Sequence, residues 1–225
     1  MLLNRLKIAR VLLLVALGSV FVLSSAFAEK AEDLIAKGVE YGRQGNYDAA
    51  IAELTRAIEL KPKSSMAYWN RGIAYYYKKN LDQAISDYTK AIKLDRNSIE
   101  AYYERSRAYA EKGAYSQASS DLQKVLELDP ENIPALNAQG NIFAKQGVYK
   151  AALMSYAQVI LIEPNNAEAY YNRAVATFNW SEETAEVSGK DYDGAWEDVH
   201  KAESLGYKID PDFLNALKNA SGREK

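Results

Sequence analysis

The sequence predicts an all-α fold: a right-handed superhelical solenoid of helix-turn-helix repeats with a C-terminal capping helix. Three observations support this prediction. Segments of the chain resemble one another at a constant spacing of 34 residues, and each holds two stretches in which apolar residues recur at helical spacing. Turn residues separate the two stretches. Because a two-helix unit cannot bury its apolar face alone, the units are expected to stack.

Four segments carry the repeat and align without a gap, beginning at Ala36, Asn70, Glu104 and Ala138. A small residue, an aromatic residue and an alanine recur at fixed places in each of them. The small residues are Gly38, Gly72, Ser106 and Gly140, the aromatic residues are Tyr41, Tyr75, Tyr109 and Phe143, and the alanines are Ala50, Ala84, Ala118 and Ala152. A proline closes three of the units, at Pro62, Pro130 and Pro164.

Each unit is predicted to be a pair of amphipathic helices. In the second unit the apolar and small residues recur at helical spacing, at Tyr68, Gly72, Tyr75, Ala84, Tyr88, Ala91 and Ile92. Asn80, Gly113 and Gly147 lie between paired helices, where a residue in the left-handed conformation can end the first helix. Small residues such as Gly72 and Ala84 let the two helix backbones approach closely.

A fifth unit is present but carries an insertion near residues 180–190. Residues 167–178 repeat the first helix and residues 192–206 supply the second, and the unit is nine residues longer than the period. The insertion is interpreted as a longer inter-helix loop or a helix extension, with an acidic contact loop through Glu182, Glu183 and Glu186 as the alternative. A capping helix over residues 211–219 is predicted from the N-cap Asp210 and from Pro211, and it should cover the open end with Phe213, Leu214 and Leu217.

Residues 1–28 are predicted to be a secretory signal peptide. Three basic residues precede an apolar run over residues 11–23, and Ala26 to Ala28 form a small-x-small cleavage signal. The run is shorter than the roughly 20 apolar residues that span a membrane, so an uncleaved anchor is the alternative. Cleavage moves the formal net charge from −2 to −5 because it removes Arg5, Lys7 and Arg10 and no acidic residue. We expect an exported protein, periplasmic or secreted, with no membrane span after cleavage and no nucleic-acid partner.

The period of 34 residues and the Gly, Tyr, Ala and Pro pattern resemble the tetratricopeptide repeat (TPR) family. The resemblance covers residues 31 to about 205. It places a TPR domain over residues 31–219, with repeats at about 31–64, 65–98, 99–132, 133–166 and 167–206. Proteins of this family are interaction scaffolds, which implies a protein or peptide partner but does not identify it.

Catalysis is not expected. The chain has no cysteine, and His200 is its only histidine, so neither a catalytic triad nor a His-based metal site can be assembled. His200 lies among the charged residues Glu197, Asp198 and Lys201, where a solvated side chain is expected. No Gly-rich phosphate loop is present. We therefore predict a protein that is not an enzyme and that needs no cofactor or metal.

The resemblance implies that the first helices of successive units line a concave groove, and it makes their exposed residues the candidate ligand-binding residues. Aromatic side chains supply stacking and apolar burial, and amides satisfy a peptide backbone. The candidates are Trp69, Asn70, Tyr76, Tyr77, Tyr103, Arg107, Asn137, Asn141, Tyr171 and Asn172. The same aromatic residues could stack on sugar rings, or they could pack only within the protein.

One specialised binding mode of the family is not matched by this sequence. Some members clamp a chaperone's C-terminal carboxylate with Lys, Asn and Arg, but this chain has Ile35 and Val39, or Tyr103 with Glu168, at the corresponding places. The prediction is a non-catalytic scaffold of the cell envelope that binds a peptide or protein segment in the groove. Carbohydrate or envelope-polymer binding is the alternative.

Overall fold

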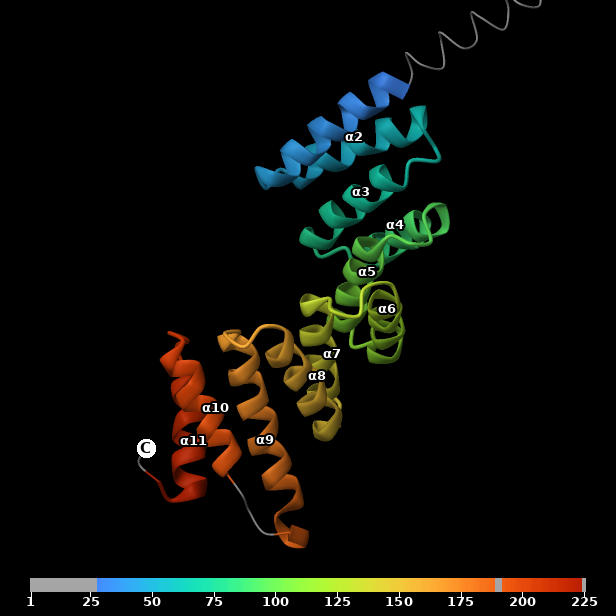
Figure 1. Cartoon of the computed structure of the whole chain (residues 1–225). Helices are drawn as coiled ribbons and strands as arrows, with labels where there is room; N and C mark the ends of the chain where they lie inside the picture. Colours follow the sequence, from blue (N-terminus) through green and yellow to red (C-terminus); the bar gives the residue numbers. More distant parts are fainter. Residues whose placement is uncertain (1–27, 189–191, 224–225) are drawn as a thin grey trace, which may run out of the picture. The chain divides into compact units, whose positions relative to one another are not determined.

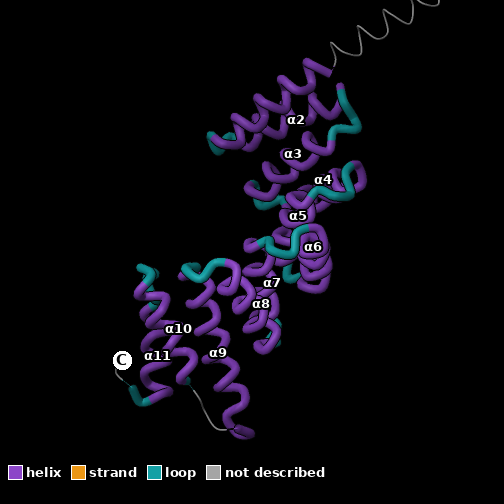
Figure 2. The backbone as a smooth tube through the Cα atoms, in the orientation of Figure 1, coloured by secondary structure: helices purple, strands orange, loops and turns teal. Residues whose placement is uncertain are grey.

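The structure is a computed structural model that describes residues 28–188 and 192–223. These residues form helices joined by turns and loops, with no strand among them (Figure 2). The all-α fold class predicted from the sequence is confirmed. A helix over residues 28–43 precedes α2 (Tyr47–Leu60), α3 (Ser65–Tyr77), α4 (Leu81–Leu94), α5 (Ile99–Glu111), α6 (Tyr115–Leu128), α7 (Ile133–Lys145), α8 (Tyr149–Ile162), α9 (Ala167–Ser188), α10 (Asp193–Ser204) and α11 (Pro211–Ser221), as Figure 1 shows. Residues 1–27, and with them nearly all of the predicted signal peptide, lie outside the described residues.

The turn between the paired helices uses one residue in the left-handed conformation. Gly113 and Gly147 have φ of 73°, as predicted. In the second unit the left-handed residue is Lys79, with φ of 63°, so the prediction that Asn80 adopts this conformation was wrong. Asn80 instead caps α4, because its Oδ1 accepts a hydrogen bond from the backbone N–H of Gln83 at 3.4 Å.

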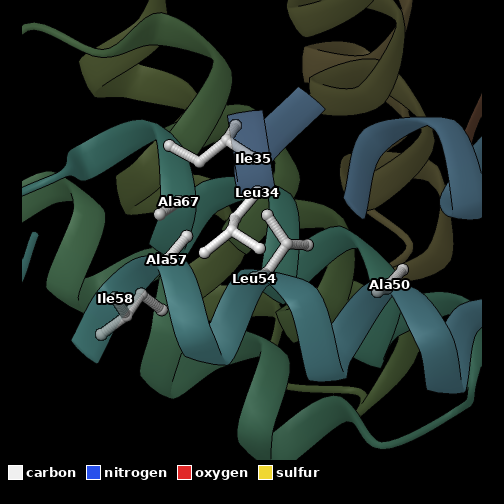
Figure 3. Packing of buried hydrophobic residues seen from close by; sticks show 8 residues of the cluster. Leu34, Ile35, Ala50, Leu54, Ala57, Ile58 and Ala67 are labelled. Carbon is white, nitrogen blue, oxygen red and sulfur yellow. The ribbon is translucent and has the colours of Figure 1, made fainter. Parts of the chain in front are cut away.

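The chain divides into two compact units, and the N-terminal unit comprises the described residues 28–108. Its helices pack in sequence order, α2 on α3 and α3 on α4. Figure 3 shows Leu34 of the first helix beside Leu54 of α2, and Ala57 near Ala67 of α3. Burial of this cluster joins the first two repeats, since its members come from three successive helices.

The C-terminal unit comprises the described residues from 109 onward. Its core at the chain end gathers Trp196 and Val199 of α10 with Leu217 of α11. α11 begins at Pro211, and Asp210 Oδ1 accepts hydrogen bonds from the backbone N–H groups of Asp212 and Phe213. α9 continues to Ser188, so the first part of the insertion extends the helix rather than forming a loop.

An ion pair with a buried carboxylate and a half-buried guanidinium joins the two helices of a repeat, and the sequence analysis did not predict it. Arg71 of α3 donates two hydrogen bonds to the Asp87 carboxylate of α4, at 2.7 and 2.9 Å. Arg173 of α9 makes the same bidentate contact with Asp198 of α10, at 2.7 Å for both bonds. The fourth unit has a neutral substitute, in which the Ser155 hydroxyl donates to Gln139 Oε1 at 3.2 Å.

Candidate functional site

A pocket of about 400 Å³ lies in the N-terminal unit between the helix over residues 28–43, α2 and α3. We call it the α2–α3 pocket. Its apolar wall comes from Val39, Leu54 and Ile73. Gly42 keeps it open, because a Cβ atom added at this position would meet no other atom within 4 Å. The remaining lining residues are Gly38, Arg43, Tyr47, Ala50, Asn70, Ala74 and Tyr77.

Two polar side chains of this pocket keep hydrogen-bonding capacity for a ligand. Arg43 is exposed and has no hydrogen-bond or ion-pair partner within the described part of the chain. Asn70 Nδ2 donates to the backbone carbonyl of Met66 at 2.9 Å, which leaves Asn70 Oδ1 and one N–H without a partner among the described residues. A guanidinium and an amide beside an apolar wall can therefore receive a carboxylate or a peptide group together with an apolar side chain.

Aromatic side chains form one edge of the α2–α3 pocket. The ring of Tyr77 stacks on that of Tyr47, with centroids 5.4 Å apart and planes 8° apart, and 51% of Tyr77 is exposed. Tyr76 meets the ring of Tyr77 edge to face at 5.6 Å. A flat, half-exposed aromatic surface thus borders the opening and is available for stacking.

A charged cluster on α5 lies against Tyr76. The Arg107 guanidinium is 4.9 Å from the centroid of the Tyr76 ring, and it donates to the Glu104 carboxylate at 2.8 Å. Burial raises the pKa of Glu104, and the attraction of Arg107 opposes that rise. Because Arg107 contacts both a ring and a carboxylate, it holds Tyr76 in place as well as offering a cation.

Two profiles of one repeat family match this chain. The profile described as "Tetratricopeptide repeat" matches residues 35–99, and the profile described as "TPR repeat" matches residues 106–147 and 140–179. The chain belongs to the tetratricopeptide repeat family. The TPR fold is that of a protein–protein interaction scaffold, and no curated protein matches this chain.

Solved structures share this fold. The TPR chain is 23% identical to MamA, with a TM-score of 0.66, and the match covers 75% of this chain and 94% of that one. It is 22% identical to YrrB, described as a TPR protein with an unusual peptide-binding site, with a TM-score of 0.66 and a match that covers 88% of this chain and 99% of that one. At these identities the likeness concerns the fold. The first TPR of Spaghetti (RPAP3), solved with the HSP90 peptide SRMEEVD, is 34% identical over 54% of this chain and 94% of that one, with a TM-score of 0.51.

The structure brings some of the predicted site residues of this TPR protein together. Asn70 and Tyr77 line the α2–α3 pocket, and Tyr76 contacts Tyr77 beside it. Trp69 packs against two core clusters of the same unit, and its Nε1 is buried without a hydrogen-bond partner among the described residues. Tyr103 lies half-buried on α5. The role of these residues in binding stays a prediction.

The other four predicted site residues belong to the C-terminal unit. Tyr171 packs within the protein, which is the alternative given for the aromatic candidates: its ring stacks on Tyr207 at 4.9 Å and meets Phe213 of α11 at 5.7 Å. Asn141 accepts a hydrogen bond from the Tyr156 hydroxyl at 2.7 Å. Asn137 Oδ1 is buried without a partner among the described residues, and Asn172 is half-buried on α9.

Sequence analysis did not identify Gly42 and Arg43, although a signal was present. In the repeat register they correspond to Tyr76 and Tyr77 of the second unit. A glycine at the place of a large aromatic residue removes a side chain from the helix surface, and this removal opens the pocket. The comparison of Gly42 with Tyr76 would have indicated the pocket.

Across residues 28–188 and 192–223, no group of three or more His, Cys, Asp or Glu side chains is arranged to hold a metal ion. His200 is exposed, and its ring lies 5.5 Å from that of Trp196. The same residues include no helix of the length and apolarity that a membrane crossing requires.

Tyr88 and Tyr156 occupy the same place in two repeats, but we expect opposite effects on stability when each is replaced by Phe. The Tyr156 hydroxyl donates to Asn141, whereas the Tyr88 hydroxyl is buried without a partner in the described chain, because Ile73 stands at the place of Asn141. We expect Tyr88→Phe to raise the free energy of unfolding by about 1 kcal/mol, and Tyr156→Phe to lower it by about 1 kcal/mol. Urea unfolding of the two variants measures both effects, and a change of the same sign in both would contradict this account.

Proposed function

We propose that this TPR protein is a non-catalytic scaffold of the cell envelope that binds a peptide segment of a protein partner in the α2–α3 pocket. The observation that carries the proposal is the pocket itself. An apolar wall, an exposed guanidinium without a partner and an amide with spare hydrogen-bonding groups meet in about 400 Å³. This volume lies within the roughly 300–1,000 Å³ of ordinary ligand pockets.

The lining residues suggest the chemistry of the bound segment. An apolar side chain would lie against Val39, Leu54 and Ile73, where its burial supplies affinity. An adjacent carboxylate, either an acidic side chain or a chain end, would pair with Arg43. Asn70 would hydrogen-bond a backbone group of the peptide.

Peptide binding by solved relatives supports the proposal. YrrB is described as having a peptide-binding site, and the first TPR of Spaghetti was solved with an HSP90 peptide. The carboxylate clamp of the chaperone adaptors remains unmatched here, because Ile35 is buried in the core and Val39 is apolar. We therefore propose a peptide partner in the envelope rather than such a chaperone.

The envelope location is supported by the predicted signal peptide alone. Its basic, apolar and cleavage regions all lie in residues 1–28. Fractionation of the producing cells, together with N-terminal sequencing of the purified chain, tests this part of the proposal. A cytoplasmic chain that begins at Met1 would overturn it.

The binding prediction is tested by filling the pocket without touching the core. Gly42→Leu places a side chain at the open position, so we expect at least a tenfold loss of partner capture. The free energy of unfolding should stay equal or rise by up to about 1 kcal/mol, since leucine is the better helix former. A photo-crosslinking residue in place of Tyr77, used in the producing cell with and without Gly42→Leu, measures the capture by mass spectrometry.

A matched control uses the same crosslinker in place of Glu59, which is exposed on α2 and does not line the pocket. Proteins captured from position 77 and lost with Gly42→Leu, but absent from the control, are pocket ligands. Identical capture from both positions, or capture that Gly42→Leu leaves unchanged, would show that the pocket does not bind the partner.

Carbohydrate binding is a second candidate, favoured by the half-exposed ring of Tyr77 stacked on Tyr47. A sugar ring would stack on Tyr77 and needs no cation, whereas the proposed peptide needs one. Arg43→Gln therefore separates the two ligands. A peptide partner should be captured less with this substitution, and a neutral glycan should bind equally well.

A further inference from the structure

The outer face of α8 differs from that of the other second helices. In the repeat register, two outward positions carry Ala52 and Glu59 on α2, Ser86 and Lys93 on α4, and Ser120 and Glu127 on α6. The same two positions of α8 carry Met154 and Leu161. These residues are 74% and 80% exposed, the highest values among the large hydrophobic residues of the described chain. Packing within the repeat does not require large apolar residues there, since the three other units have none at these two positions.

These residues form one apolar strip along the helix. Met154 and Leu161 are two helical turns apart and share one face, and the exposed small residue Ala157 lies between them. Beside the strip, a cavity of about 370 Å³ opens between α8, α9 and α10. Gly194 helps to keep it open, since the nearest atom to an added Cβ would be Thr177 Cγ2 at 3.8 Å. We call Met154, Ala157 and Leu161 the α8 strip.

We propose that the α8 strip is a self-association surface, on which two copies of this chain pair their α8 helices in antiparallel orientation about a two-fold axis. The axis passes between Ala157 and Gln158. Each Met154 then contacts the partner subunit's Leu161, so that the same apolar contact occurs twice and covers both side chains of each copy. The small side chain of Ala157 at the centre allows the two helices to approach closely.

Charge favours the antiparallel orientation over the parallel one. Lys150, in the first turn of α8, is exposed, and its Nζ lies 5.4 Å from the Trp180 ring. Antiparallel pairing sets this cation beside the last turn of the partner helix, where the helix macrodipole is negative and Glu163 follows. Parallel pairing would instead set Lys150 beside a second Lys150. The complementarity therefore indicates a second copy of the same helix in reverse direction.

The strip is small compared with a standard interface, which covers about 800 Å² on each partner. We therefore expect association in the micromolar range, as is usual for small interfaces. The proposal concerns the C-terminal unit and uses none of the residues of the α2–α3 pocket. Its failure would leave the peptide-binding proposal unchanged.

Sedimentation velocity of the purified chain over a micromolar concentration series tests the proposal. We expect a monomer–dimer equilibrium, and Met154→Glu should raise the dimer dissociation constant at least tenfold, because each carboxylate meets an apolar side chain. Ser120→Glu, at the same place of the third unit, should leave the constant unchanged. Both substituted positions are exposed, so circular dichroism should show the same helix content as the original chain.

A charge-pair variant tests the orientation. Met154→Glu combined with Leu161→Lys sets a carboxylate opposite an ammonium in the antiparallel pair, and it should restore the dimerisation that Met154→Glu weakens. In a parallel pair the same variant would place like charges together. A chain that stays monomeric at every concentration, or a dimer that Met154→Glu does not weaken, overturns the proposed surface. A double variant that stays dissociated overturns the antiparallel arrangement.

Discussion

Replacement of Arg71 by Ala is expected to lower the free energy of unfolding by about 3–5 kcal/mol. The Asp87 carboxylate accepts both of its charge-assisted hydrogen bonds from Arg71, and its side chain is 7% exposed. Loss of the guanidinium leaves a buried negative charge without that partner, and the loss of its solvation in water is then no longer offset. The hydrogen bond from Arg71 Nη1 to Thr55 Oγ1, at 3.0 Å, is lost as well.

The fourth unit provides the control for this prediction. Gln139 stands at the place of Arg71, and its Oε1 accepts a hydrogen bond from the Ser155 hydroxyl. Gln139→Ala removes only a neutral hydrogen bond, so we expect a loss of about 1 kcal/mol. Denaturant unfolding of both variants measures the difference. Equal losses in the two variants would show that the buried charge is compensated in another way.

A double variant distinguishes two contributions to the free energy of unfolding: the destabilisation by an unpaired buried carboxylate, and the net stabilisation by the ion pair. Arg71→Met with Asp87→Leu replaces both partners by apolar groups, and we expect it to recover most of the stability that Arg71→Ala loses. The pair would then act mainly by fixing how α3 and α4 meet. If the double variant were as unstable as Arg71→Ala, the pair itself would be the stabilising element.

The repeat made most of the fold predictable. A period of 34 residues fixes the helix pairs, and the positions of Gly72 and Tyr88 follow from the same register. The Arg71–Asp87 ion pair could have been predicted in the same way, since Arg71 and Asp87 recur as Arg105 and Asp121 at the same separation. Residues that recur at the same place in each repeat indicate packing positions, because every unit has to bury the same face.

The candidate site could be predicted only in part. Asn70 and Tyr77 were predicted as ligand-binding residues and line the pocket, but the pocket exists because Gly42 lacks a side chain. Candidate residues are chosen for side chains that could contact a ligand, so a glycine that opens a pocket is not among them. Tyr171 shows the opposite limit: its neighbours Tyr207 and Phe213 come from beyond the last repeat, and periodicity says nothing about how that segment docks.

Addition of one methyl group at Gly72 is expected to destabilise the protein, although alanine is the better helix former. A Cβ atom at this position would lie 2.6 Å from Tyr88 Cε1 and 2.8 Å from Cδ1, closer than carbon atoms can approach. Helix propensity gains about 1 kcal/mol from Gly→Ala, but forcing the Tyr88 ring and α4 outward costs typically 1–3 kcal/mol or more in a close-packed core. Because the ring is fully buried and cannot swing into solvent, we expect a net loss of about 1–2 kcal/mol.

Gly42 provides the matched control, since it lies in the helix over residues 28–43 and an added Cβ meets nothing within 4 Å. Gly42→Ala should therefore raise the free energy of unfolding by about 0.5–1 kcal/mol, which is the helix-propensity gain alone.

The third unit carries Ser106 and Leu122 at the places of Gly72 and Tyr88. Gly72→Ser with Tyr88→Leu copies that natural combination and should be more stable than Gly72→Ser alone, because a smaller partner accommodates the added side chain. A double-mutant cycle in denaturant measures this coupling, and the absence of coupling would mean that contact with Tyr88 is not the reason why the second unit needs a glycine.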